Sequence, residues 1–509
     1  MSPSLATLIY IAGIAGLFYL NRDESQHTSK ALWLPVVYLW VLGSRPVSFW
    51  FGGSASFGFD SQLDGSPIDG AFFQILLVAA LCVLVHRGRR TIAFLYTNLS
   101  IPLVLYFFYC LMSIFWSDYP GPALKKWIKA VGDVVMILIV FTDEEPVAAL
   151  RRLYSRTAFL LLPLSLLVIK YYPALGRTYD SWTGAQMNTG VAYDKNILGV
   201  ITYVLTLGTV WRILELLRAD EKSPYRRRQL LAQGILLLMA VWIFTTANSA
   251  TSTVCFVLGT GVMLATSVKF MRNKPAAVHI LVLSLAVSVS LVTLLGGTGL
   301  AARAVGRNPT FTGRTEIWAD VIPMALNPAV GAGFESFWPN PRVRQRFAVL
   351  IPGLPLNEAH DGYIEVYLNL GWMGVILIGL ILADGYRRAV KAFRCEPTLG
   401  ALLLAYVLTA TIYSVTEAGF RMLGANWIFL LLAVVGAGSI TTGATVAPKH
   451  PLIASAARRG LAHSRRYSSL MLQAGFSIWR IGIVHKSTQT VAPERNSARQ
   501  QAETYATKL

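Results

Sequence analysis

Apolar runs of nearly membrane-span length, separated by short polar loops, recur along most of this chain. A helix that crosses a bilayer needs about 20 mostly apolar residues. Thirteen runs approach or reach that length, namely residues 4–20, 31–50, 69–86, 99–117, 127–142, 153–172, 196–217, 229–247, 250–269, 276–297, 362–384, 399–417 and 423–440. The first run is short, and the polar pair Asn248-Ser249 alone splits two others. The pattern predicts an all-α polytopic membrane protein with twelve or thirteen transmembrane helices.

The composition agrees with this pattern and excludes other classes of protein. Of the 509 residues, 54% are hydrophobic and 14% are charged, whereas a soluble domain has about 25% charged residues. A disordered chain, a secreted disulfide scaffold and an ordinary cytosolic enzyme are therefore excluded. The chain also carries 45 Lys and Arg against 26 Asp and Glu, a net charge of +19. This excess must lie outside the apolar runs.

The basic residues follow the loops in a way that predicts orientation. One alternate set of loops is basic and includes Arg22, Arg87, Arg151, Arg227, Lys274 and Arg388. Short basic loops face the cytoplasm, so we place this set and the basic tail 441–509 there. Thirteen crossings put the N-terminus outside, and twelve put both termini inside. The charge therefore reports sidedness rather than nucleic-acid binding. An apolar stripe in residues 466–484 predicts a tail helix resting on anionic lipid.

The outer segment 298–361 is far longer than any other loop. Its aromatic content is too high for a solvated tether, and long ordered connections are usually functional. Residues 313–325, GRTEIWADVIPMA, place apolar side chains at helical spacing, which predicts an amphipathic helix at the membrane face. Asn327-Pro328 and the following glycines break that helix.

Six arginines and one histidine give this segment its candidate chemistry. The arginines are Arg303, Arg307, Arg314, Arg342, Arg344 and Arg346. A guanidinium binds phosphate or carboxylate through two parallel hydrogen bonds, although a solvated face paired with acidic residues such as Glu335 and Glu358 is the alternative. Of the seven histidines, only His360 maps outside. Asp361 can cap the following helix, whose N-terminus favours anions. The imidazole can take a proton from a sugar hydroxyl, or it simply hydrogen-bonds the loop.

Three smaller outer features are further candidates. Arg177 precedes a span that begins near Lys195, whose ammonium lies beside a helix start. Arg421, in the short turn 418–422, is a candidate phosphate ligand. Residues 119–130 place three lysines around Trp127, which we interpret as snorkelling lysines beside an interfacial tryptophan.

Several of these strings resemble a known family. GRTEIWADVIPMALNPAVGAGFESFW and the later NEAHDGYIEVYLNLGWMGV resemble the signature region of the O-antigen ligase and polysaccharide polymerase superfamily. FWSDYPGPALKKWIKAVGD is similar to its N-terminal half. The resemblance spans about residues 30–440 and is greatest to the exopolysaccharide branch.

The resemblance implies a membrane-embedded glycosyltransferase of the C fold type in residues 1–440, using neither a metal nor a nucleotide sugar. Such enzymes move a glycan from undecaprenyl diphosphate to a second acceptor on the outer face of the bacterial inner membrane. The family's histidine falls on His360, the expected base or acceptor-orienting group, and its Gly-Arg falls on Arg314, the expected diphosphate ligand. Arg177, Lys195, Arg303 and Arg421 are further expected diphosphate ligands.

Other functions are also compatible with these residues. Ligases use lipid A-core as acceptor and polymerases use another lipid-linked repeat unit, and branch resemblance alone favours a polymerase. A flippase of lipid-linked oligosaccharide usually buries ionisable residues near the bilayer midplane, whereas here the polar chemistry gathers on one outer face. A scaffold for other polysaccharide export proteins would use the basic tail.

Overall fold

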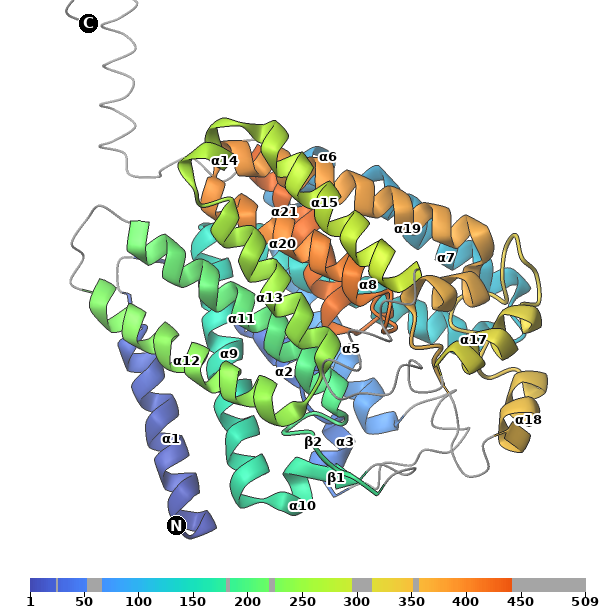
Figure 1. Cartoon of the computed structure of the whole chain (residues 1–509), viewed down its shortest axis with the longest axis horizontal. Coiled ribbons are helices and arrows are strands. Elements are labelled where there is room, and N and C mark those ends of the chain that lie inside the picture. The colour runs from blue at the N-terminus through green and yellow to red at the C-terminus, as the bar shows by residue number, and fades with distance from the viewer. Residues whose placement is uncertain are drawn as a thin grey trace, which may run out of the picture. The chain divides into compact units, whose positions relative to one another are not determined.

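The computed structural model is almost entirely helical (Figure 1). It describes residues 1–23, 26–52, 66–179, 184–218, 225–294, 314–350 and 357–441, all within the compact unit Met1–Thr445. The predicted tail helix and Arg303 therefore lie outside the described residues. In the described residues the strands are limited to the short antiparallel pair β1 (Arg177–Tyr179) and β2 (Gln186–Asn188). The predicted all-α polytopic class is confirmed.

Helices follow the predicted runs closely in the N-terminal half. The elements are α1 (Pro3–Leu20), η1 (Lys30–Leu32), α2 (Trp33–Leu42), α3 (Val47–Trp50), α5 (Pro67–His86), α6 (Arg89–Asn98), α7 (Ile101–Met112), η2 (Ser113–Trp116), α8 (Pro120–Phe141), α9 (Pro146–Tyr171), α10 (Pro173–Gly176) and α11 (Lys195–Arg218). Several of them carry Pro in the first turn. Proline fits there because the first N–H groups of a helix have no intrahelical acceptor.

The C-terminal half contains α12 (Arg226–Ala247), α13 (Ala250–Ala265), α14 (Lys269–Asn273), α15 (Pro275–Leu294), α17 (Arg314–Val321), η3 (Ile322–Met324), α18 (Pro341–Leu350), α19 (Gly362–Cys395), α20 (Pro397–Tyr413) and α21 (Ala425–Thr441). The predicted break between the two closest runs is confirmed. Asn248 adopts a left-handed conformation (φ 52°) between α12 and α13, which Asn tolerates better than most residues.

Each predicted run overlaps a helix, but the helices differ in length. Among the described residues, six are long and apolar enough to cross a membrane: α1, α5, α9, α11, α12 and α19. The pair α6 and α7–η2, bent by 100°, makes a seventh if it is one broken span. Further apolar helices, including α13, α20 and α21, have 10–17 residues. The number of crossings therefore stays a prediction.

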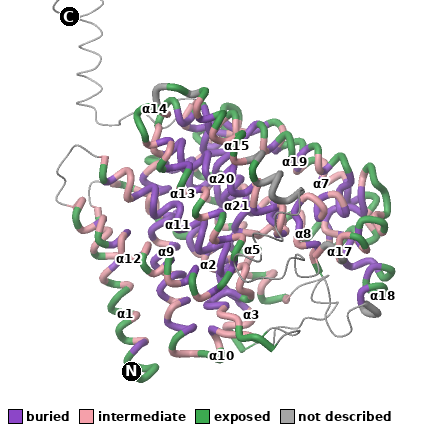
Figure 2. The backbone as a smooth tube through the Cα atoms, viewed as in Figure 1, coloured by how far each residue is buried: buried purple, intermediate pink, exposed green. Residues whose placement is uncertain are grey.

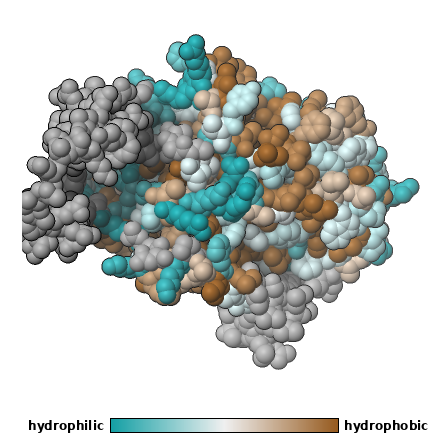
Figure 3. Space-filling view, turned by 90° about the horizontal axis from the view of Figure 1, so that it is seen from above, coloured by the Kyte–Doolittle hydropathy of each residue, from teal (hydrophilic) through white to brown (hydrophobic). Residues whose placement is uncertain are grey.

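The core lies where α20 and α21 pack against α19, α11 and α13 (Figure 2). Nearly every residue of α21 is buried, and Figure 2 shows the surrounding helices buried on their inner sides. By contrast, few residues of α1 and α5 are buried, although both helices are strongly apolar, as expected of helices that face lipid. Hydrophobic side chains also form much of the surface seen in Figure 3, around a hydrophilic patch.

The described part of the long outer segment has its own small core. Buried Phe337, Trp338 and Phe347 pack with Val321 of α17 and Leu368 of α19. A helix is present where the sequence predicts one, with α17 and η3 together covering 314–324, and its amphipathic character and its place at the membrane face stay predictions. These contacts fix the outer segment against the start of α19 (Figure 1).

A strap formed by residues 326–333 docks on a break in α19. Gly371 has φ 63°, which divides α19 into two helical parts. Ala332 N donates to Leu368 O (3.1 Å), and Trp372 N donates to Pro328 O (2.9 Å). A Cβ on Gly371 would lie 2.3 Å from the Ala329 carbonyl. Glycine is needed there both for the positive φ and for the close approach of two backbones.

Candidate functional site

His360 lies in a short loop before α19, directly after Ala359, whose N–H and carbonyl are both hydrogen-bonded. The carbonyl of Ala359 accepts a hydrogen bond from Trp318 Nε1 (2.8 Å), and its N–H donates to Glu365 Oε2 (3.0 Å). His360 itself has φ 51°, an unfavourable conformation for a residue with a Cβ. Strained conformations persist where the surroundings over-determine them and cluster at functional sites.

The start of α19 is fixed as the sequence predicts. Asp361 caps the helix, accepting from Tyr363 N (2.8 Å) and Ile364 N (2.9 Å). Gly362 N donates to Ser414 O (2.7 Å), which ties this helix start to the end of α20. Burial raises the pKa of Asp361 to about 6, against the opposing effect of the two backbone N–H groups.

Two carboxylates face the His360 ring, and two arginines hold those carboxylates. His360 Nδ1 lies 2.9 Å from Glu358 Oε1 and 3.7 Å from Glu417 Oε2. Arg314 Nη2 donates to Glu417 Oε1 (2.8 Å). Arg421 Nη1 donates to Glu358 Oε2 (3.4 Å). We call these five residues the His360 cluster; it brings together three of the residues singled out in the sequence.

The charges of the His360 cluster stabilise one another. Burial alone would raise the pKa of Glu358, but contact with His360 and the nearby arginines lower it to about 2. Burial alone would lower the pKa of His360, but Glu358 and Glu417 raise it to about 9. The imidazole is therefore protonated at neutral pH. Arg314 pairs with Glu417, and Arg421 pairs with Glu358.

Arg421 extends the site toward the strap and α8. Its Nη2 lies 3.8 Å from Glu335 Oε2, and Lys126 Nζ donates to Glu335 O (3.1 Å). Lys126 thus contacts the outer segment directly, and its snorkelling role stays a prediction. Asp133 of α8 fixes the chain just after Arg421, because its Oδ2 accepts a hydrogen bond from Leu423 N (3.1 Å).

Of the other predicted phosphate ligands that the structure describes, Lys195 lies near the His360 cluster and Arg177 does not contact it. Burial raises the pKa of Asp194, the residue before α11, and Glu417 and Glu358 raise it further. The start of α11, with Lys195 as its first residue, is thus near the His360 cluster. Arg177 instead donates through Nε to Ile169 O (3.0 Å), and no described contact connects it to the cluster. Arg303 lies outside the described residues.

Three cluster residues also have the chemistry of a metal site. The nearest ligand atoms of Glu358, His360 and Glu417 all lie within 4.8 Å of one another. However, Arg314 and Arg421 already pair with the two carboxylates. The guanidinium groups thus supply the positive charge that a cation would bring to these oxygens.

Sequence reasoning missed the residues that join the candidates together. In the sequence, Glu417 ends a predicted span, and Glu335 and Glu358 are expected only as partners of a solvated arginine face. The pair Arg346–Asp320 does fit that alternative, since its side chains are 53% and 31% exposed. A signal existed for Glu417, because an acidic residue at the end of an apolar run needs a nearby cation.

Comparison with known proteins supports the family resemblance. Residues 234–379 match the family model described as O-antigen ligase, a stretch that contains Arg314 and His360. The chain is 27% identical over 295 residues to the exopolysaccharide production protein ExoQ of Rhizobium meliloti (strain 1021). The match covers 56% of this chain and 64% of ExoQ. The predicted resemblance to the O-antigen ligase and polysaccharide polymerase superfamily, in its exopolysaccharide-related branch, is confirmed.

Proposed function

We propose that this chain is a bacterial inner-membrane glycosyltransferase that moves a glycan from undecaprenyl diphosphate to a sugar hydroxyl at the extracytoplasmic face. The observation that carries the proposal is the contact of Arg314 with His360 through Glu417. A cation for a departing diphosphate and a group for the incoming hydroxyl thus lie side by side. Both residues fall within the range that matches the O-antigen ligase family model.

Arg314 and Arg421 are the proposed ligands of the diphosphate. In the reaction, the acceptor oxygen bonds to C1 of the donor sugar while the bond from C1 to the phosphate oxygen breaks. Negative charge then develops on the departing lipid diphosphate. Guanidinium groups that are already positioned stabilise that charge in the transition state, and Lys195 lies close enough to the cluster to add to the positive potential.

His360 is the proposed acceptor of the hydroxyl proton. Its Nδ1 faces Glu358, which leaves Nε2 for the acceptor sugar. With its pKa raised to about 9, the imidazole is mostly protonated at neutral pH, and only the minor neutral form can accept a proton. The same elevated pKa makes the neutral form a stronger base, which suits a weakly acidic sugar hydroxyl.

The exopolysaccharide relative favours a polymerase over a ligase. ExoQ is described by its name as an exopolysaccharide production protein, so we propose another lipid-linked repeat unit as the acceptor. Transfer to lipid A-core, the ligase alternative, differs only in the acceptor. We also propose that the reaction needs no metal ion, because the two arginines already neutralise the carboxylates of the potential metal site.

The test uses the purified full chain in lipid vesicles with a polyprenyl-diphosphate oligosaccharide. We expect glycan transfer with release of the lipid diphosphate, and unchanged transfer with EDTA. His360→Ala and Arg314→Ala should each lower the rate about 10²–10⁴-fold. Arg346→Ala is the matched control, because this arginine lies on the same outer segment in an exposed ion pair.

Two results would contradict the proposal. Near-wild-type transfer by a correctly inserted His360→Ala or Arg314→Ala variant would remove these residues from the chemistry. Movement of the lipid-linked oligosaccharide across the vesicle without release of the carrier would instead identify a flippase.

A further inference from the structure

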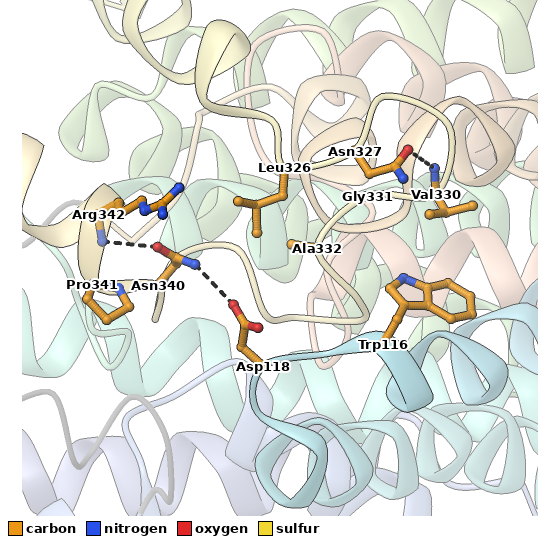
Figure 4. A pocket seen from close by; sticks show the side chains of 10 residues that line it. All are labelled: Trp116, Asp118, Leu326, Asn327, Val330, Gly331, Ala332, Asn340, Pro341 and Arg342. Atoms are coloured by element: carbon orange, nitrogen blue, oxygen red, sulfur yellow. Dashed lines mark hydrogen bonds between the residues drawn. The ribbon is translucent and has the colours of Figure 1, made fainter.

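An open groove lies beside the strap, on the outer segment and outside the His360 cluster. It has a volume of 590 Å³ and runs between Trp116 at the end of η2, Leu326 on the strap and Arg342 at the start of α18 (Figure 4). Its walls thus come from two segments that are distant in the sequence, one around Trp116 and one from Leu326 to Arg342.

Hydrogen bonds hold the polar groups of the groove in place. Asn340 is 6% exposed; its Nδ2 donates to Asp118 Oδ2 (3.1 Å) and its Oδ1 accepts from Arg342 N (3.0 Å). Asn327 Oδ1 accepts from Ala329 N (2.9 Å). These bonds fix the orientation of the Asp118 carboxylate and the Asn327 amide, which both line the groove.

The lining combines an aromatic face with several hydrogen-bonding groups. The Trp116 ring is 40% exposed and borders the groove (Figure 4). Asp118 offers acceptors, Asn327 offers N–H donors and Arg342 offers a planar set of N–H donors. A pyranose has one apolar C–H face, which stacks on an aromatic ring, and a rim of hydroxyls that need donors and acceptors. The groove provides both surfaces.

The strap connects this groove to the His360 cluster. Gly333 N donates to Asn369 O (2.8 Å), so the wall of the groove is fixed to the first helical part of α19. Asn369 follows Asp361 by eight residues, about 12 Å along a helix. The groove wall and the His360 cluster are thus both attached to the first helical part of α19.

From this geometry we propose that the groove binds sugar residues of a glycan substrate, one or more units away from the reacting bond. The assignment deepens the transferase function proposed above and rests on it for the origin of the glycan. Among the described residues, the lining holds one carboxylate, Asp118, and one guanidinium, Arg342, so it lacks the excess of positive charge that favours a diphosphate. The donor and the acceptor both carry sugar residues, so the glycan in the groove could belong to either substrate.

The first experiment measures binding without catalysis. The probe is the repeat-unit oligosaccharide released by mild acid from the producing strain's own lipid-linked intermediate, free of lipid and phosphate. It is titrated into the full chain in lipid nanodiscs. Trp116→Ala should weaken its binding about tenfold or more, and Trp116→Phe should restore most of the affinity. Trp33→Ala is the matched control, since Trp33 is 42% exposed and lies in α2 outside the groove.

The second experiment separates the two possible sources of the glycan. With the donor and acceptor concentrations varied in turn, Trp116→Ala should raise the KM of one substrate and leave kcat almost unchanged, because groove binding is equal in ground and transition states. Arg342→Gln, at an exposed position, should act in the same direction if Trp116→Ala fails to fold.

Each outcome decides the proposal. Unchanged oligosaccharide affinity and unchanged KM for both substrates in correctly folded variants would overturn the groove assignment while leaving the transferase function intact. Binding that depends on Trp116 in a protein that transfers no glycan would support the groove and overturn the transferase.

Discussion

At the scale of single residues, the pair His360–Glu358 determines how the site responds to pH. Both side chains are less than one third exposed, and each stabilises the charged form of the other. The raised pKa of His360 contributes stability that is complete below its ordinary value of 6.5 and is lost as the pH rises through about 9. The lowered pKa of Glu358 contributes stability above 4.5, which is lost as the pH falls through about 2.

We predict that Glu358→Gln shifts the pH dependence of transfer. Wild-type kcat/KM should rise with pH up to about 9, because proton transfer to His360 requires the neutral imidazole. The amide removes the charge that stabilises the imidazolium, so the rise should move to lower pH by about one unit or more. The measurement is a pH–rate profile of both proteins. Asp320→Asn, in an exposed ion pair, is the control, and an unshifted Glu358→Gln profile would argue against His360 as the base.

The same residues show how far sequence reasoning reaches at this scale. His360 and Arg314 are recognisable because motifs surround them. Arg421 was found from its place in an outer turn. Glu417 contacts Arg314 across about a hundred positions of sequence, and no local pattern encodes such a pairing. Arg177 had the expected residue type, but its backbone partner on α9 became visible only in the structure.

At the scale of elements, the helices were predictable and their irregularities were not. Apolar runs determine where a helix lies in a membrane protein, because unsatisfied backbone groups are excluded from lipid. The break at Gly371 depends instead on the strap, which supplies Pro328 O to the Trp372 N–H. Glycine is common in membrane helices, so its presence at position 371 gave no signal of a break.

We expect Gly371→Ala to destabilise the docking of the strap. The added methyl group would meet the Ala329 carbonyl at 2.3 Å, and alanine is strained at φ 63°. The cost should be about 1–3 kcal/mol, seen as a lower midpoint of thermal unfolding and faster proteolysis within 314–350.

The matched variant is Gly379→Ala in the same helix. Nothing lies within 4 Å of a Cβ at that position, so the change should be neutral or should stabilise by up to about 1 kcal/mol. Equal thermal midpoints for the two variants would show that the break at Gly371 does not bear on stability.

At the scale of the whole molecule, the charge of the loops predicts which face carries the site. Ala319 on α17 and Lys391 on α19 are both exposed. The positive-inside pattern predicts that Ala319 lies outside and that Lys391 lies in the cytoplasm. In a chain with the exposed Cys82 and Cys395 changed to Ser, Ala319→Cys should react with an impermeant maleimide in spheroplasts. Lys391→Cys should react only after permeabilisation, and the reverse result would invert the topology.

The pairing of arginines with carboxylates has one more consequence for this molecule. Glu417 occupies Arg314, and Glu358 occupies Arg421, so the chain carries its own anionic competitor for any incoming diphosphate. Binding then exchanges one ion pair for another, and only the difference between the two contributes to affinity. In the proposed reaction the same exchange would work in reverse as the lipid diphosphate departs, because the carboxylates are tethered beside the arginines at high effective concentration. The proposed site would thus sacrifice tight binding for rapid release of a multiply charged product.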